Sequence, residues 1–487
     1  MSTLSIFDAA RDAPQALAFS DGSQSLSFAE AAERARPLAD ALLSARPPSL
    51  ALTARADTES LLWLYAAFAT GTPVLTLHTR ATAAERRDAM ARVHAKEPPA
   101  VGKSQFGAEL TFAPTTPPPP SPPPPSPLPP PSPLPPDGDA RALAFIPTSG
   151  STGAPRLVEL SRRAVSSSAH ASAQNLGWQA NDRWLLCLPL AHTGGLSIVV
   201  RCLLARKSVL LFEPGPTGVL GRLDALAALA RQATLISLVP SVLGALLDAG
   251  FEAPDTLRAA LVGGAGCSPS LARRAHAAKI PLLTSYGLTE TASQVVTRRY
   301  ADRYQPLPEQ DGVVSSGQPL PGVTLRVDDG RIALRTPSLF SGYVGDGAPE
   351  LDDAGYFRTS DRGALGADGE LYVRGRSDDV IVSGGENVDP LEVEAALMAL
   401  SGVQAACVFA TPSSRFGQVV TAVLVSADPA LGDAAHLAQL LAGRLARHKV
   451  PRRARLVASL PLTASGKVDR RAVSQRFQAA FAEPDQY

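Results

Sequence analysis

Residues 143 to 300 alternate between short apolar runs and segments with helical periodicity. This alternation restricts the fold strongly, because strands that alternate with helices favour a largely parallel sheet covered by helices. The predicted strands are residues 143–146, 208–212, 235–239, 259–262 and 281–284, and the predicted helices are residues 161–176, 222–232, 241–249 and 268–279. We therefore predict a layered α/β domain. Ligands in such folds bind beyond the carboxyl ends of the strands.

The sequence outside residues 143–300 predicts three further structural units. Residues 1 to about 110 indicate a structural half-domain, with a helix that starts at Ser27 and has Glu30 in capping position. Residues 316–375 contain short β-like runs between Gly, Pro and Asp, which predict a β-rich subdomain. The predicted domains are a large multi-subdomain N-terminal domain at 1–375, a hinge at 376–378 and a small, mobile α+β C-terminal domain at 379–487.

Residues 117–136 are almost entirely proline, with a few Ser and Leu. Proline donates no backbone hydrogen bond, so this tract is compatible only with polyproline II or disorder. A ligand for an SH3-type domain is one interpretation. An exposed insertion that acts as a spacer is the interpretation we favour.

The composition excludes several function classes. The 487 residues carry a formal net charge of +1, which gives no electrostatic case for binding nucleic acid or an anionic membrane. The N-terminus lacks the pattern of a signal peptide, and no apolar stretch reaches membrane-spanning length. The four cysteines are scattered without metal or redox spacing, so we expect a cytoplasmic protein.

A stretch rich in Ser, Thr and Gly follows the strand at 143–146. It reads TSGSTGAPR from Thr148 to Arg156. Glycine lets backbone N–H groups approach a ligand closely, and the hydroxyls and the Arg156 cation add donors, so the stretch suits a polyphosphate. A flexible polar turn is the alternative. The candidate phosphate-binding residues are Thr148, Ser149, Gly150, Ser151, Thr152, Gly153 and Arg156.

Two further stretches follow predicted strands. Ser285 to Thr291 reads SYGLTET, in which Tyr286 offers a flat face for a purine and Glu290 a carboxylate for Mg²⁺. Residues 263–266 read GGAG and indicate a tight turn. The candidate nucleotide-binding residues here are Gly264, Ala265, Tyr286, Gly287 and Thr289.

Three stretches near the predicted domain junction contain candidate ligand-binding or catalytic residues. Residues 355–361 read GYFRTSD, and a carboxylate such as that of Asp361 has the lone pairs to accept from two hydroxyls. Residues 375–387 read GRSDDVIVSGGEN, where the composition changes. Residues 461–470 read PLTASGKVDR and contain Lys467. Turn, cap and surface positions are the alternatives for these residues.

Together these motifs, in this order and spacing, resemble the adenylate-forming superfamily: acyl-CoA synthetases, carrier-protein adenylation domains and luciferases. The resemblance covers nearly the whole chain outside the proline tract. It implies an acid–thiol ligase that forms an acyl-adenylate from ATP with Mg²⁺ and then uses CoA as co-substrate. Two positions depart from the pattern, because Arg156 replaces a Lys and Ser360 a Gly. A guanidinium keeps the charge but is a planar fork.

The resemblance also implies residue roles. Catalysis is assigned to Lys467, Glu290 and His192. Tyr286 would stack on adenine, Thr289 would contact phosphate, Glu290 would hold Mg²⁺, Asp361 would bind the ribose, and Arg376 would contact ribose or phosphate. Asp378 would be the hinge pivot, Gly384 and Gly385 would line the CoA thiol tunnel, and Lys467 would reach the substrate carboxylate and α-phosphate.

Residues 189–197, which read PLAHTGGLS, together with Gln294 and the SGGEN run at 383–387, resemble the o-succinylbenzoate–CoA ligase family of menaquinone biosynthesis. The predicted substrate pocket comprises His192, Thr193, Gly194, Ser197, Arg201, Gly263 and Gln294. o-Succinylbenzoate has two carboxylates, one to be activated and one that needs a partner, for which Arg201 is the candidate. Aryl-acid ligases for benzoate or anthranilate share most of the pattern and remain an alternative.

Two other classes remain open at this stage. One is a stand-alone adenylation enzyme that loads a free carrier protein, since no carrier domain is attached. The other is a non-catalytic scaffold that uses the proline tract, against which the joint presence of Glu290, Asp361, Arg376 and Lys467 argues. The sequence leaves the oligomeric state open, with a homodimer as one option.

Overall fold

The computed structural model describes residues 3–99, 139–148, 156–215, 218–383, 386–413, 415–463 and 466–481. Several predicted features lie outside the described residues. They are the proline-rich insertion at 117–136, Ser149, Gly150, Ser151, Thr152 and Gly153 of the phosphate loop, Gly384 and Gly385, and the side chain of Asp378.

A nine-stranded sheet forms the centre of the large domain, in the order β16-β13-β12-β11-β10-β8-β9-β1-β2. Neighbours from β1 to β12 are parallel, whereas β2, β13 and β16 pair antiparallel. This confirms the predicted parallel sheet. The strands are β1 (Leu17–Ser20), β2 (Ser25–Ser27), β8 (Arg183–Leu186), β9 (Ser208–Leu211), β10 (Leu235–Leu238), β11 (Ala259–Val262), β12 (Leu282–Leu288), β13 (Ser293–Thr297) and β16 (Gln318–Pro319).

A second, six-stranded sheet has the order β19-β7-β6-β4-β3-β5. Its strands are β3 (Ser49–Thr53), β4 (Val74–Leu77), β5 (Ala95–Lys96), β6 (Ala142–Thr148), β7 (Arg156–Ser161) and β19 (Gly342–Tyr343). The pair β6–β7 is antiparallel and brings Thr148 opposite Arg156, so the two ends of the phosphate loop are adjacent. The sequence pattern predicts no strand at 156–161, because this six-residue run shows no strict alternation of apolar and polar residues.

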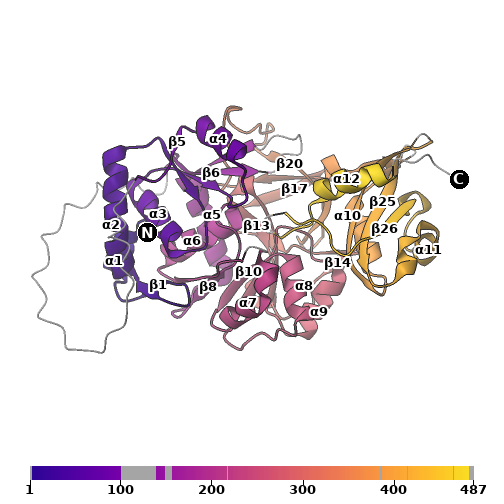
Figure 1. Cartoon of the computed structure of the whole chain (residues 1–487), viewed down its shortest axis with the longest axis horizontal. Coiled ribbons are helices and arrows are strands. Elements are labelled where there is room, and N and C mark those ends of the chain that lie inside the picture. The colour runs from indigo at the N-terminus through magenta and orange to yellow at the C-terminus, as the bar shows by residue number, and fades with distance from the viewer. Residues whose placement is uncertain are drawn as a thin grey trace, which may run out of the picture.

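Alternating residues of the nine-stranded sheet pack into two different cores, as expected when both faces are covered. Leu186 and Leu261 face the core shared with the six-stranded sheet, whereas Leu185 and Val262 face the opposite core with α7, α8 and α9. Figure 1 shows these three helices together beside β8 and β10. The helices are α1 (Ile6–Asp12), α2 (Phe28–Ala45), α3 (Thr58–Thr70), α4 (Ala83–Arg92), α5 (Arg162–Leu176), α6 (Thr193–Ala205), α7 (Leu223–Ala230), α8 (Pro240–Asp248) and α9 (Pro269–Ala277).

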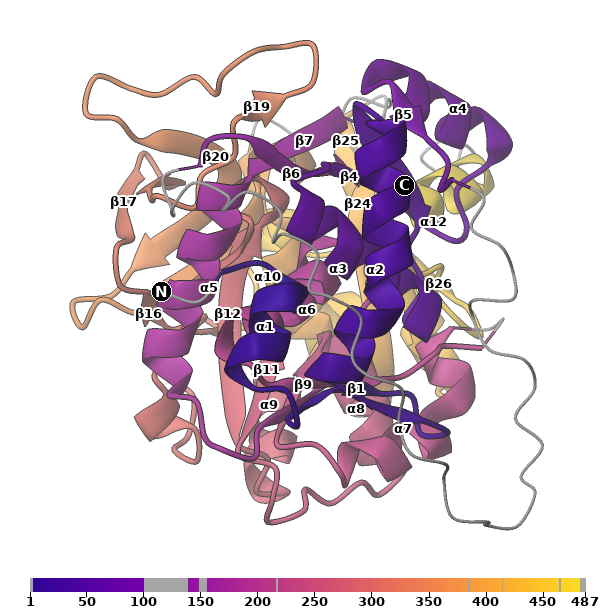
Figure 2. The same cartoon turned by 90° about the vertical axis from the view of Figure 1, so that its left-hand side faces the viewer.

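Local sequence signals explain where several helices begin. Ser27 and Glu30 form the predicted capping box at the start of α2, and the Ser161 hydroxyl accepts a hydrogen bond at the start of α5. Helix α3 is buried on nearly all sides between the two sheets, which explains its continuous apolar sequence. Figure 2 views the molecule from the side that carries α1 and α2. None of the helices in the described ranges is long and apolar enough to cross a membrane.

The predicted β-rich subdomain is a four-stranded antiparallel sheet in the order β17-β18-β20-β21. Its strands are β17 (Thr324–Asp328), β18 (Arg331–Arg335), β20 (Phe357–Leu365) and β21 (Leu371–Arg376), and a separate hairpin pairs β14 (Glu309–Gln310) with β15 (Val313–Val314). Strand β21 ends at the residue where the predicted hinge begins.

The C-terminal unit contains a five-stranded sheet covered by helices, as predicted, and lies at one end of the molecule (Figure 1). The sequence of residues 436–447 predicts one continuous helix, but α11 ends at Leu440, because Gly443 adopts a φ of 75° that stops helical backbone. The elements are β22 (Ile381–Ser383), β23 (Glu386–Val388), α10 (Pro390–Met398), β24 (Val403–Ser413), β25 (Gly417–Ser426), α11 (Ala434–Leu440), β26 (Arg453–Leu456) and α12 (Arg470–Gln478).

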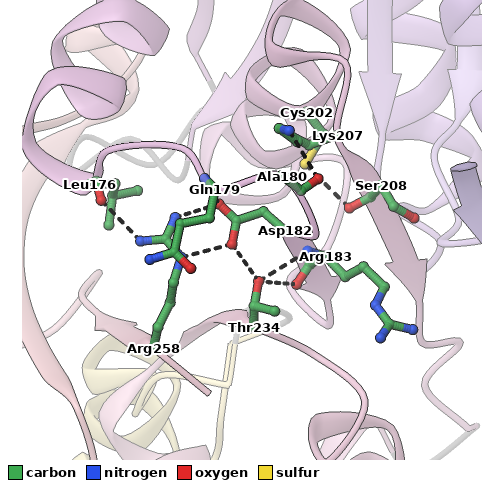
Figure 3. A network of polar contacts seen from close by, with 10 residues as sticks. All are labelled: Leu176, Gln179, Ala180, Asp182, Arg183, Cys202, Lys207, Ser208, Thr234 and Arg258. Carbon is green, nitrogen blue, oxygen red and sulfur yellow. Dashed lines mark hydrogen bonds and ion pairs between the residues drawn. The ribbon is translucent and has the colours of Figure 1, made fainter. Parts of the chain in front are cut away.

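A buried ion pair joins the amino ends of three neighbouring strands (Figure 3). The Arg258 guanidinium, just before β11, donates to both carboxylate oxygens of Asp182, just before β8, with an Nε–Oδ1 distance of 2.7 Å. Thr234, just before β10, donates to the same carboxylate at 2.8 Å. Burial alone would raise the pKa of Asp182, but the hydrogen bonds from Arg258, Gln179 and Thr234 outweigh it and hold the pKa below its usual range. This network lies at the end of the sheet opposite the predicted ligand site.

We predict that Arg258→Met lowers the free energy of unfolding by ~3–5 kcal/mol at pH 7, because it leaves the buried Asp182 charge unpaired. The folded-state pKa of Asp182 is depressed, so the pair stabilises the protein above the unfolded pKa of about 3.9, and this contribution is lost as the pH falls further. Urea unfolding followed by tryptophan fluorescence measures the difference.

The matched control is Arg274→Met, which removes the partner of Asp248 from an ion pair whose side chains are 47% and 70% exposed. An exposed pair contributes only ~0–1 kcal/mol. Equal losses in the two variants would contradict the assignment of Asp182 and Arg258 as a stabilising buried pair.

Candidate active site

The candidate site lies where β12 leaves the nine-stranded sheet. Tyr286 and Gly287 are in the last part of β12, and a 3₁₀ turn from Thr289 to Thr291 then carries Thr289 and Glu290 before β13 returns antiparallel. A side chain at Gly287 would collide with the backbone carbonyl of Ser293. The glycine therefore permits the tight return that places Tyr286 and Glu290 beside one another.

Tyr286 connects this strand end to the β-rich subdomain. Its hydroxyl donates to Asp361 Oδ2 at 2.7 Å, and Arg376 Nη1 lies 3.7 Å from Asp361 Oδ1. Asp361 and Arg376 are direct partners in the pairing of β20 with β21. Burial, together with the Asp361 charge, raises the pKa of Tyr286 well above its usual value, so its hydroxyl remains a donor. Three predicted nucleotide-binding residues from separate motifs are thus adjacent.

Glu290 and Arg156 contact a residue that the sequence analysis did not single out. The Tyr343 hydroxyl donates to Glu290 Oε1 at 2.7 Å, and the Arg156 guanidinium lies 3.3 Å from the centroid of the Tyr343 ring. Arg156 also forms an ion pair with Asp346 at 2.8 Å. The predicted phosphate contact of Arg156 therefore stays a prediction, since its partners in this structure are protein groups.

The donor set around Glu290 fits a magnesium ion that arrives with a nucleotide. Mg²⁺ in such sites takes one or two carboxylates and completes its shell with phosphate oxygens and water. Across the described ranges no group of three or more His, Cys, Asp or Glu side chains could hold a metal by itself. A single carboxylate fixed by Tyr343 matches this arrangement.

Lys467 reaches the large domain from the C-terminal unit. Gly264 has a φ of 79°, a backbone conformation that favours glycine, and a Cβ atom added there would lie 2.8 Å from Lys467 Cε, so the two residues are adjacent. The neighbouring Gly466 carbonyl accepts a hydrogen bond from Ser241 at the start of α8. Burial lowers the pKa of Lys467, and the charge of Asp361 opposes this shift. The predicted catalytic cation thus lies beside the predicted nucleotide-binding turn.

His192 precedes the first turn of α6, which contains Thr193 and Gly194. Its Nε2 is buried and has no hydrogen-bond partner among the described residues, and its ring centroid is 5.8 Å from that of His78. Burial lowers the pKa of His192 to about 4, with smaller effects from His78 and Lys467, so the ring is neutral at pH 7. An unpartnered buried nitrogen is the expected feature of a ligand-facing side chain.

Arg201 lies further along α6 and is 3% exposed. Burial lowers its pKa to about 10, which leaves the guanidinium charged at pH 7. Its Nη2 donates to Ser293 Oγ at 3.3 Å, its Nε has no acceptor, and no carboxylate in the described part of the chain pairs with it. Ser293 in turn donates to Ser197 at 3.3 Å. This cation is buried without a countercharge, which is costly unless an anionic ligand supplies one.

The other residues predicted to bind the substrate or the nucleotide lie on several different elements. The Gln294 amide donates to Ser172 in α5 at 3.3 Å, and a Cβ atom at Gly263 would lie 2.5 Å from Ser285 Oγ. Thr148 donates across the hairpin to the Arg156 carbonyl at 3.2 Å, and Ala265 is exposed after β11. His78, Tyr343 and Asp346 are the contacts that no sequence pattern indicated.

At the predicted hinge, the backbone of Asp378 lies in a 3₁₀ turn from Ser377 to Asp379. Asp379 pairs with Arg470 of α12 at 2.9 Å, and a Cβ atom at Gly375 would lie 2.7 Å from Asp389 of the C-terminal unit. The domain boundaries and the pivot role of Asp378 stay predictions.

Comparisons with known proteins agree with this geometry. The family model for the AMP-binding enzyme matches residues 6–344, and that for the AMP-binding enzyme C-terminal domain matches residues 392–467. The 2-succinylbenzoate–CoA ligase of Enterococcus faecalis is 34% identical over 351 residues, which are 69% of each chain, and that of Bacillus velezensis is 35% identical over 345 residues, 67% of each chain.

Two solved structures are similar over almost the whole chain. The o-succinylbenzoate CoA synthetase of Bacillus subtilis in complex with its acyl-adenylate intermediate has a TM-score of 0.79 at 25% identity, covering 97% of this chain and 98% of that one. ATP-bound MatB from Rhodopseudomonas palustris has a TM-score of 0.79 at 26% identity, covering 99% and 100%. The converging motifs, the two domain matches and these relatives show that the chain belongs to the AMP-binding enzyme family, the adenylate-forming family that its sequence motifs resemble.

Proposed function

We propose that the chain is an ATP-dependent o-succinylbenzoate–CoA ligase that works through an acyl-adenylate. Membership of the AMP-binding enzyme family and the names of its relatives support an AMP-forming acid–CoA ligase. The choice of o-succinylbenzoate as the substrate rests on Arg201, because this buried cation has no carboxylate partner among the described residues. A dicarboxylic acid provides one carboxylate for activation and a second for Arg201.

The first half-reaction joins the substrate carboxylate to the α-phosphorus of ATP. An oxygen–phosphorus bond forms, and the bond to pyrophosphate breaks. We assign to Lys467 the stabilisation of the charge on the carboxylate and α-phosphate as they combine, and its position beside Gly264 and near Asp361 supports this role. Tyr286 and Asp361 would bind the adenosine, and Glu290 would hold Mg²⁺, which neutralises phosphate charge when bound.

The second half-reaction transfers the acyl group to CoA. The deprotonated thiol attacks the acyl carbonyl, the carbon–sulfur bond forms, and AMP leaves with the electrons of the carbon–oxygen bond. His192 is neutral, so it does not attract the substrate carboxylate away from Lys467. Gly384 and Gly385 remain our candidates for the thiol tunnel. We also propose that residues 379–487 rotate about Asp378 between the two steps, with 1–375 as the stationary domain.

Aryl-acid ligases for benzoate or anthranilate are the alternative within the same family. A monocarboxylic acid would leave Arg201 without a countercharge, which is why we rank these substrates second. Loading of a free carrier protein would use the same first step and differ only in the thiol. We propose a cytoplasmic location, in keeping with four cysteines that all carry free thiols.

A panel of carboxylic acids tests this function. We expect o-succinylbenzoate to give the highest kcat/KM for pyrophosphate release, and we expect the product to be the CoA thioester. Benzoate and anthranilate are the matched monocarboxylic acids, and a free carrier protein is the matched alternative acceptor. A higher kcat/KM for either monoacid, or acylation of the carrier alone, would contradict the proposal.

The role of Arg201 is tested with Arg201→Gln. We expect KM for o-succinylbenzoate to rise by about 10- to 100-fold, because a charged hydrogen bond to the second carboxylate is lost. The variant should use benzoate at least as well as the wild type does, since that acid has no second carboxylate. Equal losses on both acids would indicate a structural role, and unfolding curves of the variant check its stability.

The division of labour between the domains is tested with Lys467→Ala. We expect a loss of roughly 10²–10³ in kcat for acyl-adenylate formation, because the charge acts in that transition state. Supplied with synthetic acyl-adenylate, the variant should form acyl-CoA at a near-normal rate. The comparison variant Asp378→Pro restricts the pivot backbone and should show the reverse pattern. Equal losses in both half-reactions for Lys467→Ala would contradict domain alternation.

A further inference from the structure

One short segment, residues 340–347, links the phosphate loop to the candidate metal carboxylate. Strand β19 within it pairs antiparallel with β7, the strand that begins at Arg156. The backbone N–H of Val344 donates to the Leu157 carbonyl at 2.9 Å, and that of Phe340 donates to the Glu290 carbonyl at 2.8 Å. The segment is therefore fixed to the end of the phosphate loop and to the 3₁₀ turn that carries Glu290.

A tight turn in this segment places two side chains against Arg156. The backbone N–H of Asp346 donates to the Tyr343 carbonyl at 2.9 Å, which closes the turn. Gly342 enters it with a φ of 151°, and any side chain there would collide with the Gly347 carbonyl. The Tyr343 ring lies against the face of the Arg156 guanidinium, and the Asp346 carboxylate pairs with Nη2 of the same guanidinium.

We propose that Tyr343 is a positioning residue that orients Glu290 for the metal–nucleotide complex, and that Asp346 holds Arg156 until the phosphates of ATP replace it. The inference rests on the proposed function, since it requires ATP and Mg²⁺ as ligands. Tyr343 touches both partners at once, with its hydroxyl on Glu290 at 2.7 Å and its ring face on Arg156.

The hydroxyl of Tyr343 is suited to this role because a phenol is protonated at neutral pH and donates its hydrogen to Glu290 Oε1 at 2.7 Å. A donor on Oε1 restricts rotation of the carboxylate and thereby fixes the direction of Oε2. A ligand held in one orientation binds a metal more tightly than one that must be ordered on binding.

The pair between Arg156 and Asp346 is suited to exchange. The two side chains are 42% and 58% exposed, and an exposed ion pair contributes little to stability. A polyphosphate carries more negative charge than one carboxylate and accepts the guanidinium fork equally well. Because the cation–π contact with Tyr343 does not depend on the anion, Arg156 can keep its place on the ring while its anionic partner changes. This assigns a use to arginine at a position where lysine is usual in the family.

Calorimetric titration of the full-length protein with ATP, with and without Mg²⁺, tests the role of Tyr343. In Tyr343→Phe we expect the gain in ATP affinity that Mg²⁺ provides to fall about tenfold, because a hydrogen bond to a charged group is lost. Affinity for ATP without Mg²⁺ should be unchanged. In a Glu290→Gln background the same substitution should have no further effect. The matched control is Tyr304→Phe, whose ring also carries an arginine, Arg303, but is 48% exposed.

The same titration tests Asp346. We expect Asp346→Asn to bind ATP about two- to fivefold more tightly, since the competing carboxylate is removed. In an Arg156→Ala background this gain should vanish. The control is Asp248→Asn, which breaks the similarly exposed pair with Arg274.

An unchanged magnesium effect in Tyr343→Phe would overturn the positioning role, and equal or weaker ATP binding by Asp346→Asn would overturn the exchange. Neither measurement includes an acid or CoA. A wild-type protein that shows the magnesium effect but activates no carboxylic acid would contradict the proposed function alone. Melting temperatures of both variants identify any loss of folding, and the double variants distinguish a local effect from general destabilisation.

Discussion

The close approach of β12 and β13 at Gly287 is the constraint on which the candidate site depends. Without a side chain at this position, the chain can turn back immediately after the strand. That return places Tyr286 against Asp361 of the β-rich subdomain and directs Glu290 toward Tyr343 of the second sheet. One strand end therefore connects three parts of the large domain, and a bulkier residue there would separate them.

A second close approach completes the site from outside the large domain. Gly264, held at positive φ, leaves room for the Lys467 side chain, whose charge lies near Asp361. The contact between Ser241 and the Gly466 carbonyl holds the loop that carries Lys467 against α8. In the domain alternation that we propose, the C-terminal unit releases these contacts before the second half-reaction.

Two groups of buried charges beside the central sheet differ in whether a countercharge accompanies them. At the amino ends, Asp182, Thr234 and Arg258 form a network in which every charge has a partner (Figure 3). In α6 and at its N-cap, which follow the carboxyl end of β8, His192 Nε2 and Arg201 Nε are buried without partners in the described structure. A buried guanidinium without a countercharge is costly, so Arg201, unlike Arg258, is suited to an anionic ligand.

Elements with a strong local signal could be predicted from the sequence. The capping box at Ser27 and the apolar strand that ends at Val262 are encoded by neighbouring residues, and the structure has both at these positions, whereas β12 continues past the predicted end at Thr284 to Leu288. Strand β7 was missed because its apolar residues do not alternate, and α11 was predicted too long because Gly443 was not recognised as a stop. The pairing with β6 makes residues 156–161 a strand, and the positive φ of Gly443 ends α11.

The chemical groups available to this protein can be read from short runs of residues such as those around Thr148, Glu290 and Lys467, because nucleotide binding requires particular residue types. Which residues meet across separate runs depends on the folded chain. Tyr343 and Asp346 reach Arg156 from 187 and 190 residues further along the chain, and His78 meets His192 from another sheet. These contacts have no sequence signal, since they arise from strand pairing and from the burial that packs one sheet against another.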